Sequence, residues 1–402
     1  MYKFPLRTAV LALALSTAFA AHASDSDFSY RFSGFGTVGY TETNSNDVTL
    51  TNPGQFKGAD KSGSTLLDSR IGGQLDLTFS PKLSATVQAI AMQNQKGKFK
   101  PQLEWAFLRY KLSNDVSARV GQLGFPAYLV SDFRYVGYAN PWVRAPLEVY
   151  GLAALDSYQG ADLTWSHSAG TGYLTVQGLA GHASSPAVDN GTLAGRIKVN
   201  QLAGAYVTYE IGNLRIRGGA STGKVSYITS GTKALIGGLE MAGMTDTVNA
   251  IDADSARTTF MNLGGTYDAN NILAMVEYAK LNSASLIGHS QGWYGTFGYR
   301  LGKVMPYVSY AGYNKQDDRS MNHVPAMGPL IPLAAAVDGQ LMSDNQRTAS
   351  LGVRWDVYKN IAIKAQYDHV SPSQRGGTFS HVDSAYNGHP VNVYSTVVDF
   401  VF

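Results

Sequence analysis

The chain of 402 residues contains no cysteine, which excludes a disulfide framework and a thiolate metal site. No stretch approaches about 18–20 consecutive apolar residues, so we expect no membrane-spanning helix. Charged residues make up only 15% of the chain and the net charge is +3, which gives no basic excess for binding nucleic acid. These absences argue against a helical membrane bundle, a disulfide-rich scaffold and a nucleic-acid-binding protein.

The N-terminal segment has the three parts of a secretory signal peptide. Lys3 and Arg7 give it a positive start, residues 8–20 are mostly apolar, and residues 21–23 read Ala-His-Ala. This pattern predicts a signal peptide over residues 1–23, cleaved after Ala23, and an exported mature chain of residues 24–402. Because Lys3 and Arg7 supply two of the three net positive charges, the mature chain has a net charge of +1.

The last thirteen residues, 390–402, alternate between two kinds of side chain. One face of this segment carries Tyr394, Val398, Phe400 and Phe402, and the other face carries Asp399. An apolar face with aromatic rings near both ends fits a strand that has lipid on one side and water on the other. The plainer alternative is the terminal strand of a soluble β protein.

Alternating segments of this kind recur along the whole mature chain. Sixteen of them occupy residues 29–41, 68–80, 83–95, 102–113, 116–124, 156–167, 172–183, 198–210, 214–225, 257–268, 272–281, 290–301, 304–316, 346–358, 361–370 and 390–402. After the first segment, short turns alternate with longer loops, as in a barrel with periplasmic turns and extracellular loops. An even, closed set of strands also leaves no sheet edge exposed to lipid. The sequence therefore predicts an all-β fold: one transmembrane antiparallel β-barrel of sixteen strands, spanning residues 24–402.

The alternation also predicts which side chains face lipid. Large outward residues in the late strands are Trp293, Phe297, Tyr299, Val308, Tyr310, Leu351, Val353, Trp355, Ile361, Ile363 and Tyr367. Outward residues of the early strands are smaller: Gly34, Gly36, Gly73, Ala85, Ala89 and Ala91. Small residues allow close approach of backbones, so this flank is either a subunit contact or a place where small residues are simply tolerated.

The other face of each strand is polar and predicts a hydrated lumen. Its charged residues are Arg70, Arg119, Arg215, Arg217, Arg300, Arg354, Lys364, Asp76, Asp162, Glu277, Asp356, Asp368 and Asp399. The segment 102–113 is ambiguous, because placing Arg109 and Lys111 inside turns Glu104 outward. About sixteen strands enclose an aqueous channel rather than a packed interior.

In architecture the mature chain resembles the general diffusion porins of Gram-negative bacteria. The resemblance rests on the sixteen segments, the alternation of turns and loops, the terminal Phe402 and a long loop between the fifth and sixth segments. It implies an outer-membrane homotrimer whose second loop reaches over a neighbouring subunit. It also implies that the third loop folds into the pore and sets its acids against a basic cluster on the facing wall.

The third loop supplies the candidate pore constriction. We expect Asp132 and Glu148 of this loop to face Arg70, Arg109 and Arg119 of the wall, because opposed charges in a narrow pore select among solutes. The loop also departs from the short Pro-Glu-Phe-Gly-Gly pattern of enterobacterial porins and contains more aromatic residues.

Two arginines of the same loop leave the selectivity open. Arg134 and Arg144 either make the constriction prefer anions or pair with Asp132 and Glu148 inside the loop, where they only hold its shape.

Other loops carry weaker signals. The long loops 226–255 and 317–345 contain apolar patches that plug the vestibule, pack on the rim or contact a partner. Lys96, Lys98 and Lys100 meet lipopolysaccharide phosphates or a neighbouring subunit, or are solvated. His381, Asp383 and His389 share the last loop and either bind a metal or, as loop histidines usually do, form ordinary polar surface; no cofactor is expected.

The predicted function is passive diffusion of ions and small hydrophilic solutes through a water-filled channel. A substrate-specific channel, with the aromatic third loop as a binding slide, is the first alternative. A barrel enzyme is the second, although the histidines are scattered, no H-E-x-x-H motif occurs and no catalytic residue is expected. An adhesin or structural barrel without an open lumen is the third.

Overall fold

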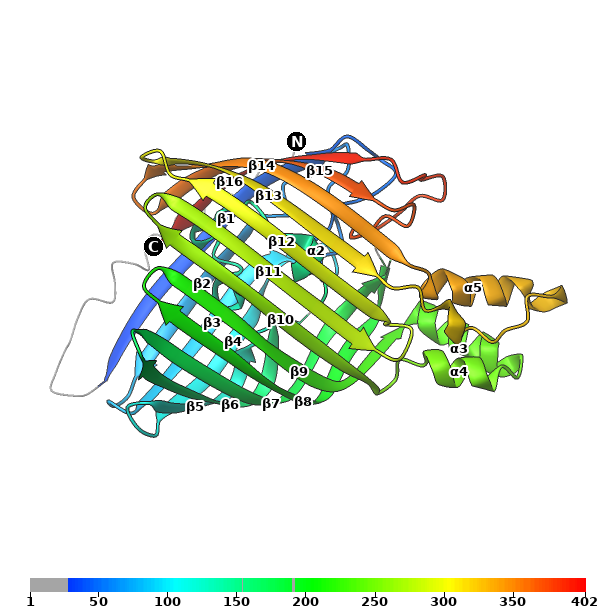
Figure 1. The fold of residues 1–402 in the computed structure, drawn as a ribbon, viewed down its shortest axis with the longest axis horizontal. Coiled ribbons are helices and arrows are strands. Elements are labelled where there is room, and N and C mark those ends of the chain that lie inside the picture. Colours follow the sequence, from blue (N-terminus) through cyan, green and yellow to red (C-terminus); the bar gives the residue numbers. More distant parts are fainter. Residues whose placement is uncertain (1–27, 154, 190–191) are drawn as a thin grey trace.

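A computed structural model describes residues 28–402 except 154 and 190–191, so the predicted signal peptide lies outside the described residues. Sixteen antiparallel strands form a closed barrel in which each strand pairs with its neighbours in sequence, and β1 pairs with β16 (Figure 1). The strands are β1 Ser29–Thr43, β2 Arg70–Thr78, β3 Leu83–Gln93, β4 Phe99–Lys111, β5 Val116–Gly124, β6 Ser157–Ala169, β7 Gly172–Asp189, β8 Thr192–Ile211, β9 Leu214–Thr229, β10 Ala256–Ala269, β11 Ile272–Ser283, β12 His289–Tyr299, β13 Val304–Lys315, β14 Asp344–Tyr358, β15 Ile361–Pro372 and β16 Val391–Val401. The predicted fold class and strand number are confirmed.

The strand ends differ from the prediction mainly on the side of the longer loops. β7 and β8 extend through most of the segment expected to be a loop at 184–197. The connections at 94–98 and 284–288 are as short as turns. The strict alternation of short turns and long loops is therefore wrong at these places, because polar strand ends beyond the lipid lack the alternating pattern that marks a spanning strand.

A β-bulge resolves the ambiguity of β4. Gln88 of β3 pairs with Trp105 while the next residue, Ala89, pairs with Leu103, so Glu104 is the extra residue. A bulge shifts the alternation by one position. As a result Leu103 is exposed on the outer face, whereas Glu104 is buried near the third loop and Arg109 still faces inward.

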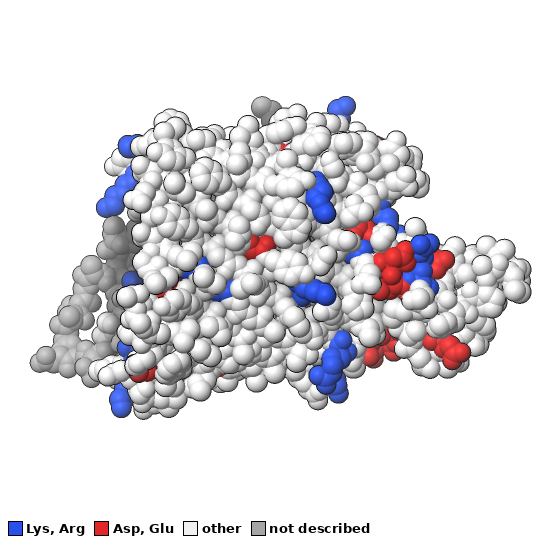
Figure 2. All heavy atoms as spheres, in the orientation of Figure 1, with Lys and Arg blue, Asp and Glu red and all other residues white. Residues whose placement is uncertain are grey.

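The outer surface is an apolar belt with aromatic residues toward the strand ends. Val38, Val120, Leu263 and Val276 are more than half exposed, as a lipid-facing surface requires. Charged side chains are sparse over the middle of the face in Figure 2 and gather toward its ends. The predicted outward residues Phe297, Val308 and Leu351 belong to this belt.

Barrel closure between β1 and β16 explains two of the small outward residues. The amide of Gly34 donates to the Phe402 carbonyl at 2.8 Å, and the Phe402 amide donates back at 2.9 Å. A Cβ on Gly34 would stand 2.2 Å from the Phe402 ring, and one on Gly36 would stand 2.3 Å from the Phe400 ring. The aromatic rings thus cover the glycines of the neighbouring strand, a known device in sheets.

Replacing Gly36 by alanine is expected to displace the Phe400 ring and lower the free energy of unfolding by about 1–3 kcal/mol. Gly178 is a matched control, because a Cβ added there meets open space, and alanine in a strand is about 0.5–1 kcal/mol more favourable than glycine. Guanidinium unfolding of both variants in lipid vesicles measures the difference. Equal stability of the two variants would contradict this role of Gly36.

The two long loops form a small helical cluster at the end of the barrel. Their helices are α3 Ser230–Met241, α4 Thr245–Ile251 and α5 Ile331–Leu341, which share a core around Leu239, Ile251 and Val337. The cluster extends beyond the long-loop end of the barrel (Figure 1). The apolar patches of these loops therefore pack on each other. No helix in the described ranges is long and apolar enough to span a membrane.

Candidate functional site

The third loop, residues 125–156, folds into the barrel as predicted. It contains the 3-10 turns η1 Ser131–Phe133 and η2 Gly137–Ala139 and the short helix α2 Leu147–Tyr150. In Figure 1, α2 is seen inside the ring of strands, and it contacts β11, β12 and β13. The loop therefore crosses the lumen and meets the opposite wall.

A buried ion pair of the wall holds the centre of the loop. The Nζ atom of Lys364 on β15 lies 2.8 Å from Oδ2 of Asp399 on β16, and both side chains are almost completely buried. The same Nζ donates to the carbonyls of Gly137 at 2.7 Å and Trp142 at 3.0 Å. A Cβ on Gly137 would stand 1.9 Å from Oδ1 of Asp399. The loop backbone thus needs glycine at this point of contact.

Three arginines of the wall bind further loop carbonyls. Arg70 donates through Nε to the Tyr135 carbonyl at 2.7 Å. Arg354 donates to the Tyr138 carbonyl at 2.6 Å, and Arg217 donates to the Pro126 carbonyl at 3.0 Å. Hydrogen bonds from charged donors are stronger than neutral ones. These contacts come from strands β2, β14 and β9, so the loop is attached around the barrel.

The aromatic residues of the loop are buried against the wall from β10 to β13. The Trp142 indole donates to Thr296 Oγ1 at 2.9 Å, and the Tyr150 hydroxyl donates to Glu277 at 2.9 Å. The Tyr128 ring packs edge-on against Phe260 with centroids 5.3 Å apart. The expectation of a wholly polar wall is wrong here, because the loop and these strands share a hydrophobic core.

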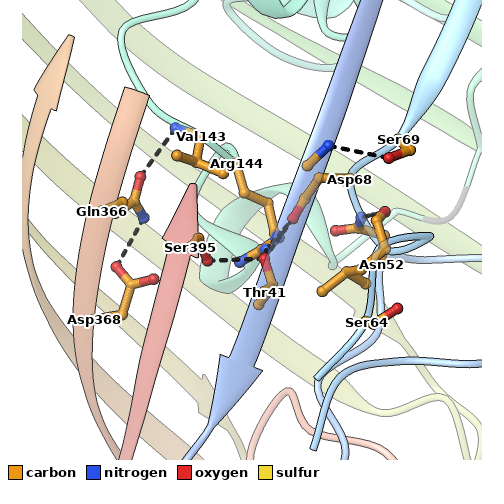
Figure 3. A network of polar contacts seen from close by, with 12 residues as sticks. Thr41, Asn52, Ser64, Asp68, Ser69, Val143, Arg144, Gln366, Asp368 and Ser395 are labelled. Carbon is orange, nitrogen blue, oxygen red and sulfur yellow. Dashed lines mark hydrogen bonds and ion pairs between the residues drawn. The ribbon is translucent and has the colours of Figure 1, made fainter. Parts of the chain in front are cut away.

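Arg144 is attached to the wall on the other side of the lumen (Figure 3). Its guanidinium lies 2.6 Å from Oδ2 of Asp68 and donates through Nε to Oδ1 at 3.0 Å. The Asp68 carboxylate also accepts from the Thr41 hydroxyl at 2.8 Å. Next along the loop, the Val143 amide donates to Gln366 at 3.0 Å, and Gln366 donates to Asp368 at 2.8 Å. Loop and wall thus form one continuous polar network.

Three cavities follow one another from the long-loop end to the short-turn end. The outer cavity has a volume of about 400 Å³ and the inner one about 770 Å³. Between them lies a cavity of only about 70 Å³, which shares Asn52 and Gln55 with the outer cavity and Asn140 with the inner one. Asp68, Arg70, Arg134 and Arg144 line this narrow cavity.

The structure separates the seven predicted constriction residues into three groups. Arg70, Arg134 and Arg144 line the narrow cavity, Asp132 lies toward Arg109 and Arg119, and Glu148 stands apart on the other side of the loop. The carboxylate of Asp132 lies 3.9 Å from the guanidinium of Arg217, which is not one of the seven predicted residues. The expectation that Glu148 faces the arginines is wrong, because it accepts a hydrogen bond from Gln346 on β14 at 2.7 Å.

The two loop arginines pair with partners that were not predicted. Arg134 lies 2.6 Å from Asp156 at the end of the loop, and Arg144 pairs with Asp68 of the wall. The alternative in which they pair with Asp132 and Glu148 is therefore wrong. Asp68 and Asp156 were not among the predicted site residues. Each is the first residue of a predicted segment, and in the structure each lies in the loop just before its strand, since β2 begins at Arg70 and β6 at Ser157.

Glu148 gives a pH-dependent contribution to stability. Burial is the largest cause that raises its pKa, and hydrogen bonds from Thr348 and Gln346 oppose this shift. A carboxyl whose pKa is raised by folding favours the folded state below its unfolded pKa of about 4.3, and this contribution is lost as the pH rises through the folded pKa. Glu148→Gln is therefore expected to gain stability relative to wild type as the pH rises from about 4 to neutrality. A pH series of guanidinium unfolding measures this, and a difference that stays constant with pH would contradict it.

The sequence contains one short motif that is typical of enzymes, and its position in the fold decides whether it can act as one. Residues 219–223 read Gly-Ala-Ser-Thr-Gly, the spacing of a nucleophile elbow, which requires a turn from strand to helix. These residues instead lie within β9, where Ser221 is buried and accepts from the Tyr206 hydroxyl at 3.3 Å. The motif therefore lacks the geometry that exposes a nucleophilic serine.

Solved structures share this fold at low sequence identity. OmpT of Vibrio cholerae, an outer-membrane protein, is 14% identical with a TM-score of 0.54, over 95% of this chain and 99% of that one. The outer membrane channel DcaP of Acinetobacter baumannii is 12% identical with a TM-score of 0.54, over 96% and 100%. An anion-selective porin from Comamonas acidovorans is 12% identical with a TM-score of 0.52, over 93% and 100%.

The chain has the fold of outer-membrane barrels. No protein-family profile and no curated protein matches its sequence. The structural likeness therefore supports the barrel architecture, and the function has to be argued from the site.

Proposed function

We propose that the protein is an outer-membrane porin of the general diffusion type, without catalysis or cofactor. Ions and small hydrophilic solutes would pass from the outer cavity through the narrow cavity to the inner one. The observation that carries this proposal is the attached third loop, which leaves a narrow cavity lined by charged side chains between two wider ones. Charged rings of this kind set selectivity in other channels.

The charges of the narrow cavity support a preference for anions. Arg144 is neutralised by Asp68 and Arg134 by Asp156. Among the residues that the structure describes, Arg70 forms no ion pair within 4 Å, and its contact with the loop is to a neutral carbonyl. One net positive charge therefore remains. A solved porin of similar fold is described as anion-selective.

A trimer in the outer membrane completes the proposal. OmpT of Vibrio cholerae, with the same fold, has a structure described as a trimer form, and the small outward residues Ala85, Ala89 and Ala91 offer a flank for close subunit contact. The exposed Lys96, Lys98 and Lys100 lie at the long-loop end, where lipopolysaccharide phosphates would meet them.

Swelling of lipid vesicles in uncharged sugars tests the diffusion function. Vesicles containing the folded protein should swell at rates that fall steadily from a pentose to a trisaccharide, because the narrow cavity hinders larger solutes more than smaller ones. Vesicles with heat-unfolded protein are the control. Absence of swelling would overturn the proposal, whereas saturable uptake of one solute would favour a substrate-specific channel.

A further inference from the structure

The outer half of the lumen contains a second kind of cavity, with an apolar lining. It measures about 220 Å³ and lies between the third loop and strands β8 to β11. Its walls include Phe125 and Leu152 of the loop, Ile197 and Val199 of β8, Phe260 of β10 and Leu281 of β11. An apolar cavity of about 150 Å³ inside a protein binds benzene, so this one has room for a single aromatic ring or a branched aliphatic group.

A β-bulge in β8 creates this apolar wall. The register between β8 and β9 shifts between Asn200 and Ala203, and Gln201 has a positive φ of 53°. Regular alternation from the inward Leu202 would turn Lys198 into the lumen. The bulge instead turns Ile197 and Val199 inward and leaves Lys198 exposed. Bulges that re-aim side chains commonly occur next to functional sites.

The apolar cavity opens on the entrance of the proposed pathway. It shares Leu152, Ile197 and Leu281 with the outer cavity of about 400 Å³. The outer cavity also has polar lining residues, among them Asn52, Gln55 and His381. A solute at this junction therefore meets an apolar wall and polar groups at the same time.

We propose that this cavity is a binding site for the apolar group of small amphipathic solutes, whose polar part remains in the outer cavity. The transport of such solutes rests on the proposed channel function, whereas their binding does not. Removing an aromatic ring or a branched aliphatic group from water favours its residence at this wall. The site thereby concentrates these solutes ahead of the narrow cavity.

Two uncharged probes with the same polar part test the site. N-acetyl-phenylalaninamide carries a benzyl group, and N-acetyl-glycinamide carries none. In single-channel recordings in potassium chloride, the phenylalanine derivative is expected to block the current saturably and at about tenfold lower concentration than the glycine derivative. Equal blocking by the two probes would overturn the proposal.

Variants in the cavity wall locate the effect. Ile197→Asn and Leu281→Asn, both at half-buried positions facing the cavity, should bring the two probes to nearly equal blocking. Leu281→Met keeps the wall apolar and should retain the preference. So should Met327→Asn, which changes an exposed residue of the seventh loop, the long loop 317–345 between β13 and β14. A preference that survives both asparagine variants would place the binding elsewhere and overturn the assignment.

Equilibrium dialysis separates the site from the channel. The phenylalanine derivative is dialysed against protein in lipid nanodiscs, which avoids detergent in the cavity. Binding by the wild-type protein that is lost in Leu281→Asn supports the site. If the same protein carries no current, the site stands and only the channel function fails. Absence of binding by folded protein, with a normal open-channel current, overturns the site and leaves the channel function intact.

Discussion

Replacing Lys364 by methionine is expected to lower the free energy of unfolding by about 3–5 kcal/mol, because Asp399 is then buried without its partner charge. The same change removes the donor to the carbonyls of Gly137 and Trp142. The loop should therefore move more freely, and the single-channel current should become noisier and larger on average. Guanidinium unfolding in vesicles and planar-bilayer recording measure the two effects.

Two further variants serve as controls for this result. Lys359→Met removes an exposed lysine from the turn between β14 and β15 and should leave stability and current unchanged. Lys364→Met combined with Asp399→Asn removes both buried charges, so part of the lost stability should return. If Lys364→Met alone were as stable as Lys359→Met, the ion pair would not hold the loop as described.

Replacing Arg70 by glutamate is expected to reverse the ion preference of the channel from anions to cations. The lining of the narrow cavity would change from one excess positive charge to one excess negative charge. A unit charge about 4 Å from an ion in water changes its energy by about 1 kcal/mol, so the reversal costs an anion about 2 kcal/mol and favours a cation by about the same amount. The permeability ratio should therefore change by about 4 kcal/mol, or roughly several hundredfold. The reversal potential in a salt gradient measures the change.

Lys82→Glu provides the matched charge reversal outside the pore, on an exposed turn between β2 and β3. It should leave the reversal potential unchanged, and high salt should weaken the effect of Arg70→Glu by screening. An anion preference that persists in Arg70→Glu would show that ions do not pass the narrow cavity.

The sequence predicted the barrel because every strand that spans the lipid must alternate between outward apolar and inward polar side chains. The outward residues of β12 and β13, and of β14 as far as Trp355, alternate without interruption, as Phe297 and Leu351 illustrate. The alternation is interrupted elsewhere in the wall. Bulges at Glu104 and near Gln201 shift the alternation, and no local composition marks them.

The sequence predicted several of the charged residues that line the lumen, but not which of them contact one another or the third loop. Arg217, Glu277 and Lys364 were correctly placed on the inner face, as their contacts with the loop show. Asp399 was also correctly placed there, as its ion pair with Lys364 shows. Which of them binds the third loop depends on how the loop folds inside the barrel. That conformation is set by packing across more than a hundred residues of sequence, as between Tyr150 and Glu277, which no local pattern encodes.

The central claim is that ions cross the barrel through the narrow cavity, and the absence of native cysteine allows a direct measurement. Met92 lines this cavity, and Met327 lies exposed in the seventh loop. A charged methanethiosulfonate reagent added to Met92→Cys in a planar bilayer should reduce the current in steps. The same reagent should modify Met327→Cys, as checked by mass spectrometry, without changing the current. Complete modification of Met92→Cys with an unchanged current would contradict the account.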